Sequence, residues 1–473
     1  MKIILPFLLL FFVCICAKGQ VKIWSLKACM DTALERNILL NQEQLNLQIT
    51  NINLLQAKAA MLPNLYLNDT HGLNSGFSLD PYTNQYTTQN ISSNNLSLNS
   101  SVNIFNGHIL LYTVRQNRQL YNASLQDVDK TKNDIVLNVL AGYLQLLMDY
   151  EAIDVANAQV EATNVQLGQT QKFVQFGKVT ELTLLQIISQ LAADKLTVVN
   201  AENQLQLDKL ILLQLMETPV TADFAIVRVP VLELYVNAPL PPANIYPIAA
   251  AFWPPLKGAA LRTEAAASGI KIAQTYGLPL LTLNAGLKTG YSSIRSNFQY
   301  DTTFQSTTIG YVKGDPTQPV IGNVPTYNSN KQIQSFGDQL KNNFGEFVSL
   351  SLSVPIFNRY YAHSAIAIAK INVRSAKLNQ QQAANDLRKA IETVSTNQVS
   401  AGKKLIAVQE QADVEKRTYT DMEKKYAFGV ISATDFLIEK NNYNKVNMLL
   451  IQAKYDYMLK VKMVDFYLGK KNY

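Results

Sequence analysis

The sequence contains few of the residues that usually build catalytic or metal sites. Only three histidines and three cysteines occur among its 473 residues, and 16% of the residues are charged. His71, His108 and His363 are far from one another and from Cys29, so they form no metal-ligand or nucleophile pattern. Glycine-rich phosphate-binding motifs and paired carboxylates at a telling spacing are also missing. The sequence therefore disfavours an enzyme and suggests no cofactor and no metal.

Long hydrophobic runs are missing as well, except at the N-terminus. A run of about 18 apolar residues, which a membrane-spanning helix needs, does not occur beyond residue 19. Residues 1–19 combine Lys2, an apolar run and the small-x-small pattern Ala17-Lys18-Gly19, which is typical of a cleaved export signal. An uncleaved membrane anchor is the alternative.

Cleavage after Gly19 changes the inventory of cysteine and charge. Cys29 alone remains, and it cannot form an internal disulfide. The mature chain would keep 40 basic and 35 acidic residues, and this small excess is spread along the chain. The charge pattern therefore does not indicate a nucleic-acid partner.

Two amphipathic stretches, at residues 96–107 and 348–359, organise the rest of the chain. Apolar and polar residues alternate over about ten positions in each, which predicts a strand with one apolar and one polar face. Each stretch runs into the sequence Ser-Val-x-Ile-Phe-Asn, and the Asn there can cap a following helix. The residues of these two strand–helix junctions are Phe105, Asn106, Phe357 and Asn358.

The two stretches lie 252 residues apart, and the same offset relates Phe176-Gly177 to Phe428-Gly429. Two matches at one offset indicate a duplicated unit. We therefore expect a signal peptide at 1–19, a first repeat at 20–217, a proline-rich joint at 218–247 and a second repeat at 248–473. Each repeat should contain a helix, two strands and a long helical hairpin.

The hairpin helices are expected to be very long. Residues 107–172 contain no proline and carry apolar residues three and four positions apart, and residues 359–425 show a similar pattern. A helix of this length would extend roughly 100 Å and must pack lengthwise on other helices. The segments between the paired strands, 71–94 and 292–343, are expected to be polar loops.

Four amphipathic strands cannot close a membrane barrel, because the smallest barrels need about eight. Either the strands form an ordinary sheet in a soluble protein, or several chains share one barrel. The export signal and the strand lengths favour a shared outer-membrane barrel.

Several motifs occur in a telling order: Trp24-Ser-Leu at the start of the first helix, Leu62-Pro-Asn-Leu65, the two strand–helix junctions, and Tyr426-Ala-Phe-Gly429 followed by Asp435-Phe-Leu437. With them the mature chain resembles the TolC-type outer-membrane efflux proteins. The resemblance implies an α+β membrane protein of a Gram-negative bacterium. It would be a homotrimer with a 12-strand β-barrel, four strands per chain, continued through the periplasm by a long α-helical coiled barrel.

The resemblance also implies a function and partners. The channel would passively conduct substrates to the outside from an inner-membrane pump, of RND or ABC type, through a periplasmic adaptor (membrane fusion) protein. It would contact outer-membrane lipid and no nucleic acid. A type I protein-secretion duct and a non-channel periplasmic or surface helical scaffold are the alternatives.

In this family the hairpin turns lie at the periplasmic mouth of the pore. The resemblance places Gly177 and Gly429 at these turns, where the adaptor would dock, and a left-handed conformation is expected for both glycines. It places Tyr426 and Asp435 at positions that face the lumen. Three copies of Asp435 would form an acidic ring that favours cations, whereas a solvated carboxylate at a helix start is the alternative.

The first hairpin departs from this gate pattern. Thr183 occupies the acidic position there, and Glu181 lies two residues earlier. We therefore expect mouth closure to depend partly on apolar packing. The apolar residues expected to contribute are Leu182, Leu185, Phe436 and Leu437.

Overall fold

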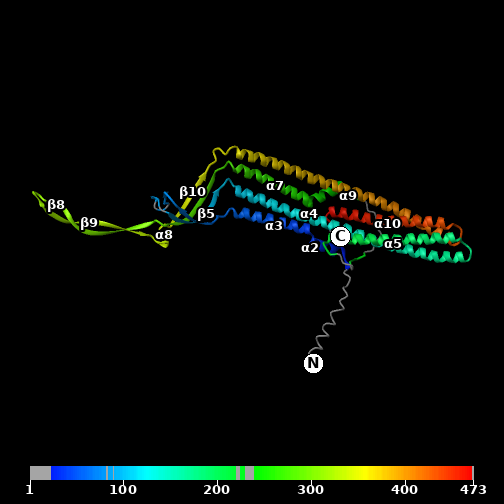
Figure 1. Cartoon of the computed structure of the whole chain (residues 1–473). Helices are drawn as coiled ribbons and strands as arrows, with labels where there is room; N and C mark the ends of the chain where they lie inside the picture. The colour runs from blue at the N-terminus through cyan, green and yellow to red at the C-terminus, as the bar shows by residue number, and fades with distance from the viewer. Residues whose placement is uncertain are drawn as a thin grey trace, which may run out of the picture. The chain divides into compact units, whose positions relative to one another are not determined.

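The computed structural model describes residues 23–80, 82, 84–88, 90–219, 224–228 and 239–470. The expected signal peptide lies outside these residues, as do parts of the expected joint at 218–247. The chain divides into two compact units (Figure 1). Unit 1 comprises the described residues of Met1–Ile52, Arg118–Ala266 and Asn372–Tyr473, and unit 2 comprises those of Asn53–Asn117 and Ala267–Ile371.

Unit 1 consists mainly of two helical hairpins. Helices α4 (Ile109–Gln175) and α5 (Glu181–Leu215) form the first, and α9 (Tyr361–Ala427) and α10 (Ala433–Tyr467) form the second. Both outgoing helices have 67 residues and both returning helices have 35. The turns of the two hairpins lie at the same end of unit 1 (Figure 1). The expected long helices are therefore present.

The helices that precede each hairpin are broken once. The helix expected in the first repeat is divided into α2 (Leu26–Arg36) and α3 (Ile38–Ala59), and the Ser25 hydroxyl caps α2 by accepting from the N–H of Ala28. Asn37 causes the break, because its backbone N–H donates to Ala33 while its side-chain oxygen accepts from the N–H of Leu40 at 3.0 Å. In the second half, α6 (Pro242–Phe252) and α7 (Pro254–Thr275) are likewise separate.

The largest apolar core of unit 1 joins α2, α4 and α5. Cys29, Leu146 and Leu212 are fully buried in it. The short parallel pair β1 (Ile23–Trp24) and β6 (Ala225–Ile226) closes this core, and the hydroxyl of Tyr143 donates to the Val227 carbonyl at 2.8 Å. The packing of these residues, and not a disulfide, stabilises the junction of the helices.

Unit 2 contains an antiparallel sheet with the strand order β10-β7-β5-β2. Its strands are β2 (Tyr66–Asn74), β5 (Ile91–Phe105), β7 (Leu280–Ser292) and β10 (Gly345–Ser353). Strands β5 and β10 correspond to the two amphipathic stretches, although β10 ends at Ser353, and β2 and β7 are the second strand expected in each repeat.

The segments expected as polar loops contain further strands. Residues 71–94 include the end of β2 and a small hairpin of β3 (Ser78–Leu79) and β4 (Tyr86–Thr87). Residues 292–343 form a long antiparallel ribbon of β8 (Ser296–Val312) and β9 (Asp315–Ile333), followed by α8 (Phe336–Asn342). The prediction of a loop there was wrong, because aromatic and β-branched residues alternate with polar ones and Gly314, at φ 96°, permits a tight turn.

Candidate functional site

The four-stranded sheet places most of its apolar and most of its polar side chains on opposite faces. Directly paired residues of an antiparallel sheet point to the same side. Leu98 pairs with Leu287, and Leu283 pairs with both Val102 and Leu350. One face carries Leu67, Leu96, Leu98, Val102, Leu281, Leu283, Leu287, Val348, Leu350 and Leu352, together with Asp69, Ser100, Thr289 and Glu346. The other face carries Asn68, Ser97, Asn99, Ser101, Asn103, Thr282, Asn284, Lys288, Ser349 and Ser351.

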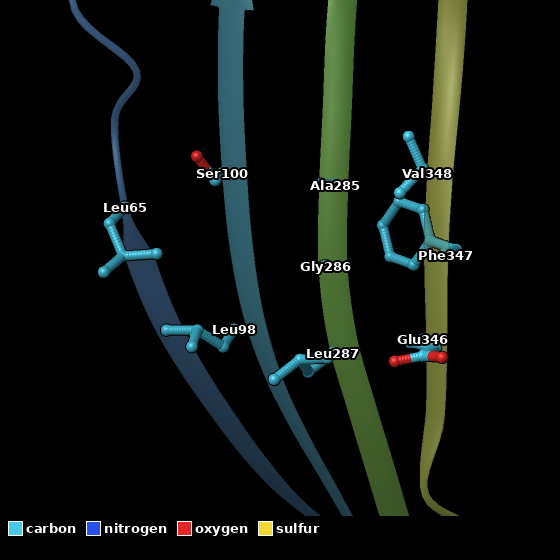
Figure 2. Close-up of a pocket in the computed structure, with 9 residues that line it drawn as sticks. All are labelled: Leu65, Leu98, Ser100, Ala285, Gly286, Leu287, Glu346, Phe347 and Val348. Carbon is cyan, nitrogen blue, oxygen red and sulfur yellow. The ribbon is translucent and has the colours of Figure 1, made fainter.

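The apolar face is exposed within a single chain. Leu67 is 69% exposed, Leu350 62% and Val348 76%. A hollow of about 380 Å³ lies over this sheet, with Leu65, Leu98 and Leu287 on its lining (Figure 2). So large a contiguous apolar surface calls for an apolar environment in place of water.

At the strand–helix junctions, Phe105 ends β5 and Asn106 follows it, while Phe357 and Asn358 lie between β10 and α9. The carbonyl oxygens of Asn106 and Asn358 accept the N–H groups of Ile109 and Tyr361, the first residues of α4 and α9, at 3.2 Å and 3.0 Å.

Neither Asn is at the N-cap position of its helix, so the predicted capping role was wrong. Residues with positive φ stand directly before the helices, at 70° for His108 and 65° for Tyr360. The chain therefore turns sharply after each Asn, and the helix begins three residues later.

The two hairpin turns share one backbone geometry. Gly177 and Gly429 have φ of 68° and 72°, so the predicted left-handed conformation is confirmed at both. The N–H of Lys178 donates to the Phe173 carbonyl at 2.8 Å, and the N–H of Val430 donates to the Lys425 carbonyl at 2.9 Å. These six-to-one hydrogen bonds are those of a Schellman motif.

The returning helices also begin alike. Thr180 caps α5 by accepting from the N–H of Thr183, and Ser432 caps α10 by accepting from the N–H of Asp435 at 3.1 Å. The Ser432 hydroxyl also donates to the Asp435 carboxylate at 2.7 Å. Asp435 is exposed, and so is Glu181 at the first position of α5. Asp435 therefore combines a capping contact with an open carboxylate.

Tyr426 lies inside the chain and not on its surface. It is only 7% exposed, its ring stacks on Phe436 at 4.9 Å, and its hydroxyl is 3.3 Å from that of Thr170 on α4. The structure thus places Tyr426 between the two hairpins. Leu182 and Leu185, in contrast, are 66% and 58% exposed.

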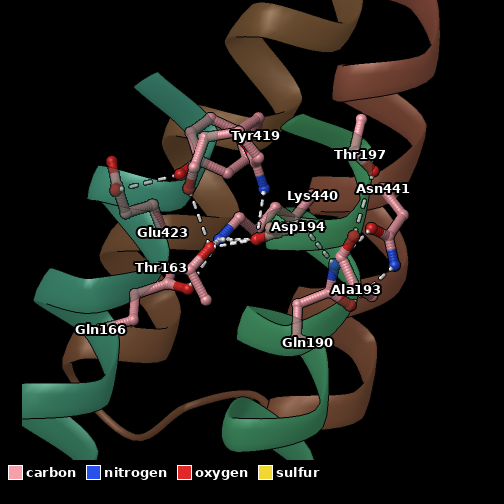
Figure 3. A network of polar contacts seen from close by, with 11 residues as sticks. Thr163, Gln166, Gln190, Ala193, Asp194, Thr197, Tyr419, Glu423, Lys440 and Asn441 are labelled. Atoms are coloured by element: carbon pink, nitrogen blue, oxygen red, sulfur yellow. Dashed lines mark hydrogen bonds and ion pairs between the residues drawn. The ribbon is translucent and has the colours of Figure 1, made fainter. Parts of the chain in front are cut away.

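The sequence did not single out the buried polar network next to these turns. Lys440 of α10 is fully buried, with its Nζ at 2.6 Å from the Thr163 hydroxyl, 3.1 Å from Gln166 Oε1 and 4.0 Å from Asp194 (Figure 3). Its position four residues after Phe436, on the same face of α10, was the signal that could have revealed it.

Burial governs the electrostatics of the network. Desolvation lowers the pKa of Lys440 to about 8, while the carboxylates of Asp194 and Glu423 oppose this shift by favouring the ammonium form. A second buried group lies farther along the first hairpin. Burial, together with the hydrogen bond and charge of Asp208, raises the pKa of Asp149 to about 7.

A sheet with an exposed apolar face, combined with long paired helical hairpins, defines an α+β channel protein of a membrane. The chain belongs to the outer membrane efflux protein family, whose model matches residues 29–217 and 246–470. It is an outer-membrane exit channel for efflux and not an enzyme. Its place is the outer membrane. The family resemblance inferred from the sequence is confirmed.

Solved structures show the same fold. The CmeC outer membrane channel of Campylobacter jejuni aligns with a TM-score of 0.72 at 17% identity, covering 94% of this chain and 85% of that one. The outer membrane protein VceC of Vibrio cholerae gives 0.72 at 14% identity, covering 94% and 96%. The open-state MtrE outer membrane channel of Neisseria gonorrhoeae gives 0.69 at 16%, covering 94% and 88%. A search of curated proteins found no match.

Proposed function

We propose that the chain forms one third of a homotrimeric channel. Three copies of a four-stranded sheet supply twelve strands, enough to close a membrane barrel that one chain cannot close. The observation that carries this proposal is the separation of the two sheet faces. The leucine-rich face would meet outer-membrane lipid, and the Ser, Thr and Asn face would line a water-filled lumen.

A second apolar surface supports the contact between copies. Helix α5 exposes a row of large apolar residues along its length. They are Leu182, Leu185, Ile188, Leu196, Val199, Leu207 and Ile211, each between 44% and 66% exposed. In a trimer this row would pack against the hairpins of the neighbouring copy and build a hollow helical cylinder in the periplasm.

By length and composition alone, α5 could also cross a membrane. Its buried aspartates favour the cylinder instead. Asp194 accepts from Gln190 on its own helix and contacts Lys440 of α10, and Asp208 accepts from Gln145 of α4. These contacts tie α5 lengthwise to the other helices of unit 1, as a cylinder wall requires.

The hairpin turns would form the periplasmic mouth. We assign Asp435, with Glu181 and Thr183 at the matching start of α5, to the rim of the mouth, and Tyr426 to the contact that holds the rim helices together. The turns at Gly177 and Gly429 would be the docking surface for a periplasmic adaptor, which connects the channel to an inner-membrane pump. The open carboxylate of Asp435 and the exposed turn geometry support this assignment.

The chain would have arisen by duplication of one unit, with repeats at 20–217 and 248–473 and a joint at 218–247. The equal lengths of the paired helices support this. So do the matching Schellman turns and helix caps at Gly177 and Gly429.

The first experiment is the mass of the detergent-solubilised protein from the outer-membrane fraction, by light scattering with the detergent contribution subtracted. A mass of three chains, with conductance after reconstitution into a bilayer, would support the shared barrel. A monomer without conductance would contradict it and would favour a helical scaffold.

A further inference from the structure

Lys440 connects the two hairpins inside one chain. Its ammonium donates to Thr163 and Gln166 of α4 and contacts Asp194 of α5, so one side chain on α10 binds both helices of the other hairpin (Figure 3). The Thr163 hydroxyl in turn donates to the Asp194 carboxylate. The carboxylate nearest to the ammonium of Lys440, that of Asp194, therefore belongs to the opposite hairpin.

Neighbouring contacts extend this connection. The amides of Gln190 on α5 and Asn441 on α10 exchange hydrogen bonds of 3.1 Å and 3.3 Å. On the other side, Tyr419 of α9 stacks on Tyr443 of α10 at 5.0 Å and donates to Glu423 at 3.3 Å. All four helices of the two hairpins thus meet at the level of Lys440.

Because Lys440 and Asp194 are buried, their contact cannot be weakened gradually by solvent. Lys440 is fully buried and Asp194 is 5% exposed, so neither charge can turn to water without moving the helices. Separating such a pair leaves an uncompensated charge in a low-dielectric interior, which is strongly unfavourable. The network therefore favours one alignment of the hairpins.

The contacts of Lys440 lie along the helices, away from the hairpin turns. Lys440 is about 10 Å along α10 from its first residue, Ala433, and Thr163 is about 18 Å before the end of α4, at a rise of about 1.5 Å per residue. Nearer the turns, the described residues join the hairpins through neutral side-chain hydrogen bonds of 3.3 Å, Thr170 with Tyr426 and Gln186 with Thr434. Neutral hydrogen bonds are easier to break than a buried charged one.

We propose that Lys440 is a positioning residue that fixes hairpin α9/α10 against hairpin α4/α5 inside the periplasmic mouth, so that only the turns beyond it move when the mouth opens. This inference rests on the proposed trimeric channel. According to this inference, the part of each hairpin that moves ends at Lys440 and its partners Thr163, Gln166 and Asp194.

The test compares Lys440→Met, the double variant Lys440→Met/Asp194→Asn and the control Lys445→Met in planar bilayers. Lys445 is an exposed lysine on the same helix. The double variant contains no unpaired buried charge, and Asn can keep the hydrogen bonds to Thr163 and Gln190, so it should assemble. We expect the ratio of open to closed time to rise about ten-fold or more in both Lys440 variants, since each loses a charged hydrogen-bond link, and to stay unchanged in the control.

The double variant separates a positioning role from simple charge compensation. If Lys440 only neutralises Asp194, the double variant will show the gating of the wild type, and the proposal is overturned. Unchanged gating in Lys440→Met would also overturn it. If neither the wild type nor the control forms a conducting trimer, the proposed function itself fails, which is a different outcome from conducting channels whose gating ignores Lys440.

Discussion

Two arginine substitutions at neighbouring positions of β10 test which sheet face meets lipid. Leu350 pairs with Leu283 and Ser351 pairs with Thr282, so the two side chains point to opposite faces. In the proposed barrel, Leu350→Arg puts a guanidinium into the hydrocarbon region, whereas Ser351→Arg puts it into the aqueous lumen. Each variant is the matched control for the other, because the new residue and its place along the strand are nearly the same.

The register of β10 gives the size of the effect. Nine residues of β10 pair with β7, from Gly345 to Ser353. At about 3.3 Å per residue and a tilt of about 40°, they span about 23 Å, close to the apolar band of about 25 Å of such barrels. Leu350 is next to the middle of this stretch. Leu350→Arg should therefore cost about 2–4 kcal/mol, or about 30-fold to 900-fold in the folding equilibrium.

The assay is urea unfolding of purified protein in lipid vesicles, together with the amount of assembled protein in the outer-membrane fraction. We expect Leu350→Arg to lower the unfolding midpoint and the assembled amount strongly, and Ser351→Arg to change both little. If Ser351→Arg is the more harmful, the two faces are assigned the wrong way round. Equal damage from both would mean that the sheet does not separate lipid from water.

Three further experiments test the turns and a buried carboxyl group. Asp435→Ala should reduce the preference of the pore for cations over anions in bilayer recordings. Ser432→Ala, which removes the cap but keeps the carboxylate, should not change this preference. Equal selectivity in the two variants would mean that Asp435 contributes only to capping the helix. Gly177→Ala should destabilise the protein by about 1–2 kcal/mol, because φ is 68° there, while Gly168→Ala, inside α4 with no atom within 4 Å of the new Cβ, should stabilise it by about 0.5–1 kcal/mol in thermal melts. The raised pKa of Asp149, about 7, means that the folded chain holds this proton more strongly than the unfolded chain does. The resulting stability is present below about pH 4 and is lost as the pH rises toward 7. Asp149→Asn should flatten this part of the melting profile, and an unchanged slope would contradict the assignment.

Local patterns predicted much of this fold. The alternation in residues 96–107 specified both the strand β5 and its two faces, since a strand has only two faces and its side chains alternate between them. Gly177 and Gly429 specified their turns, because a left-handed residue is cheap only for glycine. The sequence therefore predicted local structure correctly where a residue type or a spacing is compatible with only one backbone conformation.

The sequence did not predict features that depend on partners far along the chain. Asn37 resembles other polar residues of a helix surface, and only its hydrogen bonds reveal that it ends one helix and caps the next. Lys440 is one of many lysines, and its buried hydrogen-bond partner Thr163 lies 277 positions earlier. The family resemblance predicted that Tyr426 faces the lumen. The turn motif does not reveal that the Tyr426 ring stacks on Phe436.

The buried thiol of Cys29 makes this chain suitable for spectroscopic labelling. Cys29 is fully buried, and desolvation raises its pKa to about 12, so at neutral pH its thiol stays protonated. Maleimide and methanethiosulfonate reagents need the thiolate, so they should leave Cys29 unmodified. In a mature chain that begins after Gly19 and so lacks Cys14 and Cys16, a cysteine introduced at the hairpin turns or on either face of β10 would carry the single spin label or fluorophore, and movements of the mouth could be followed without first removing Cys29.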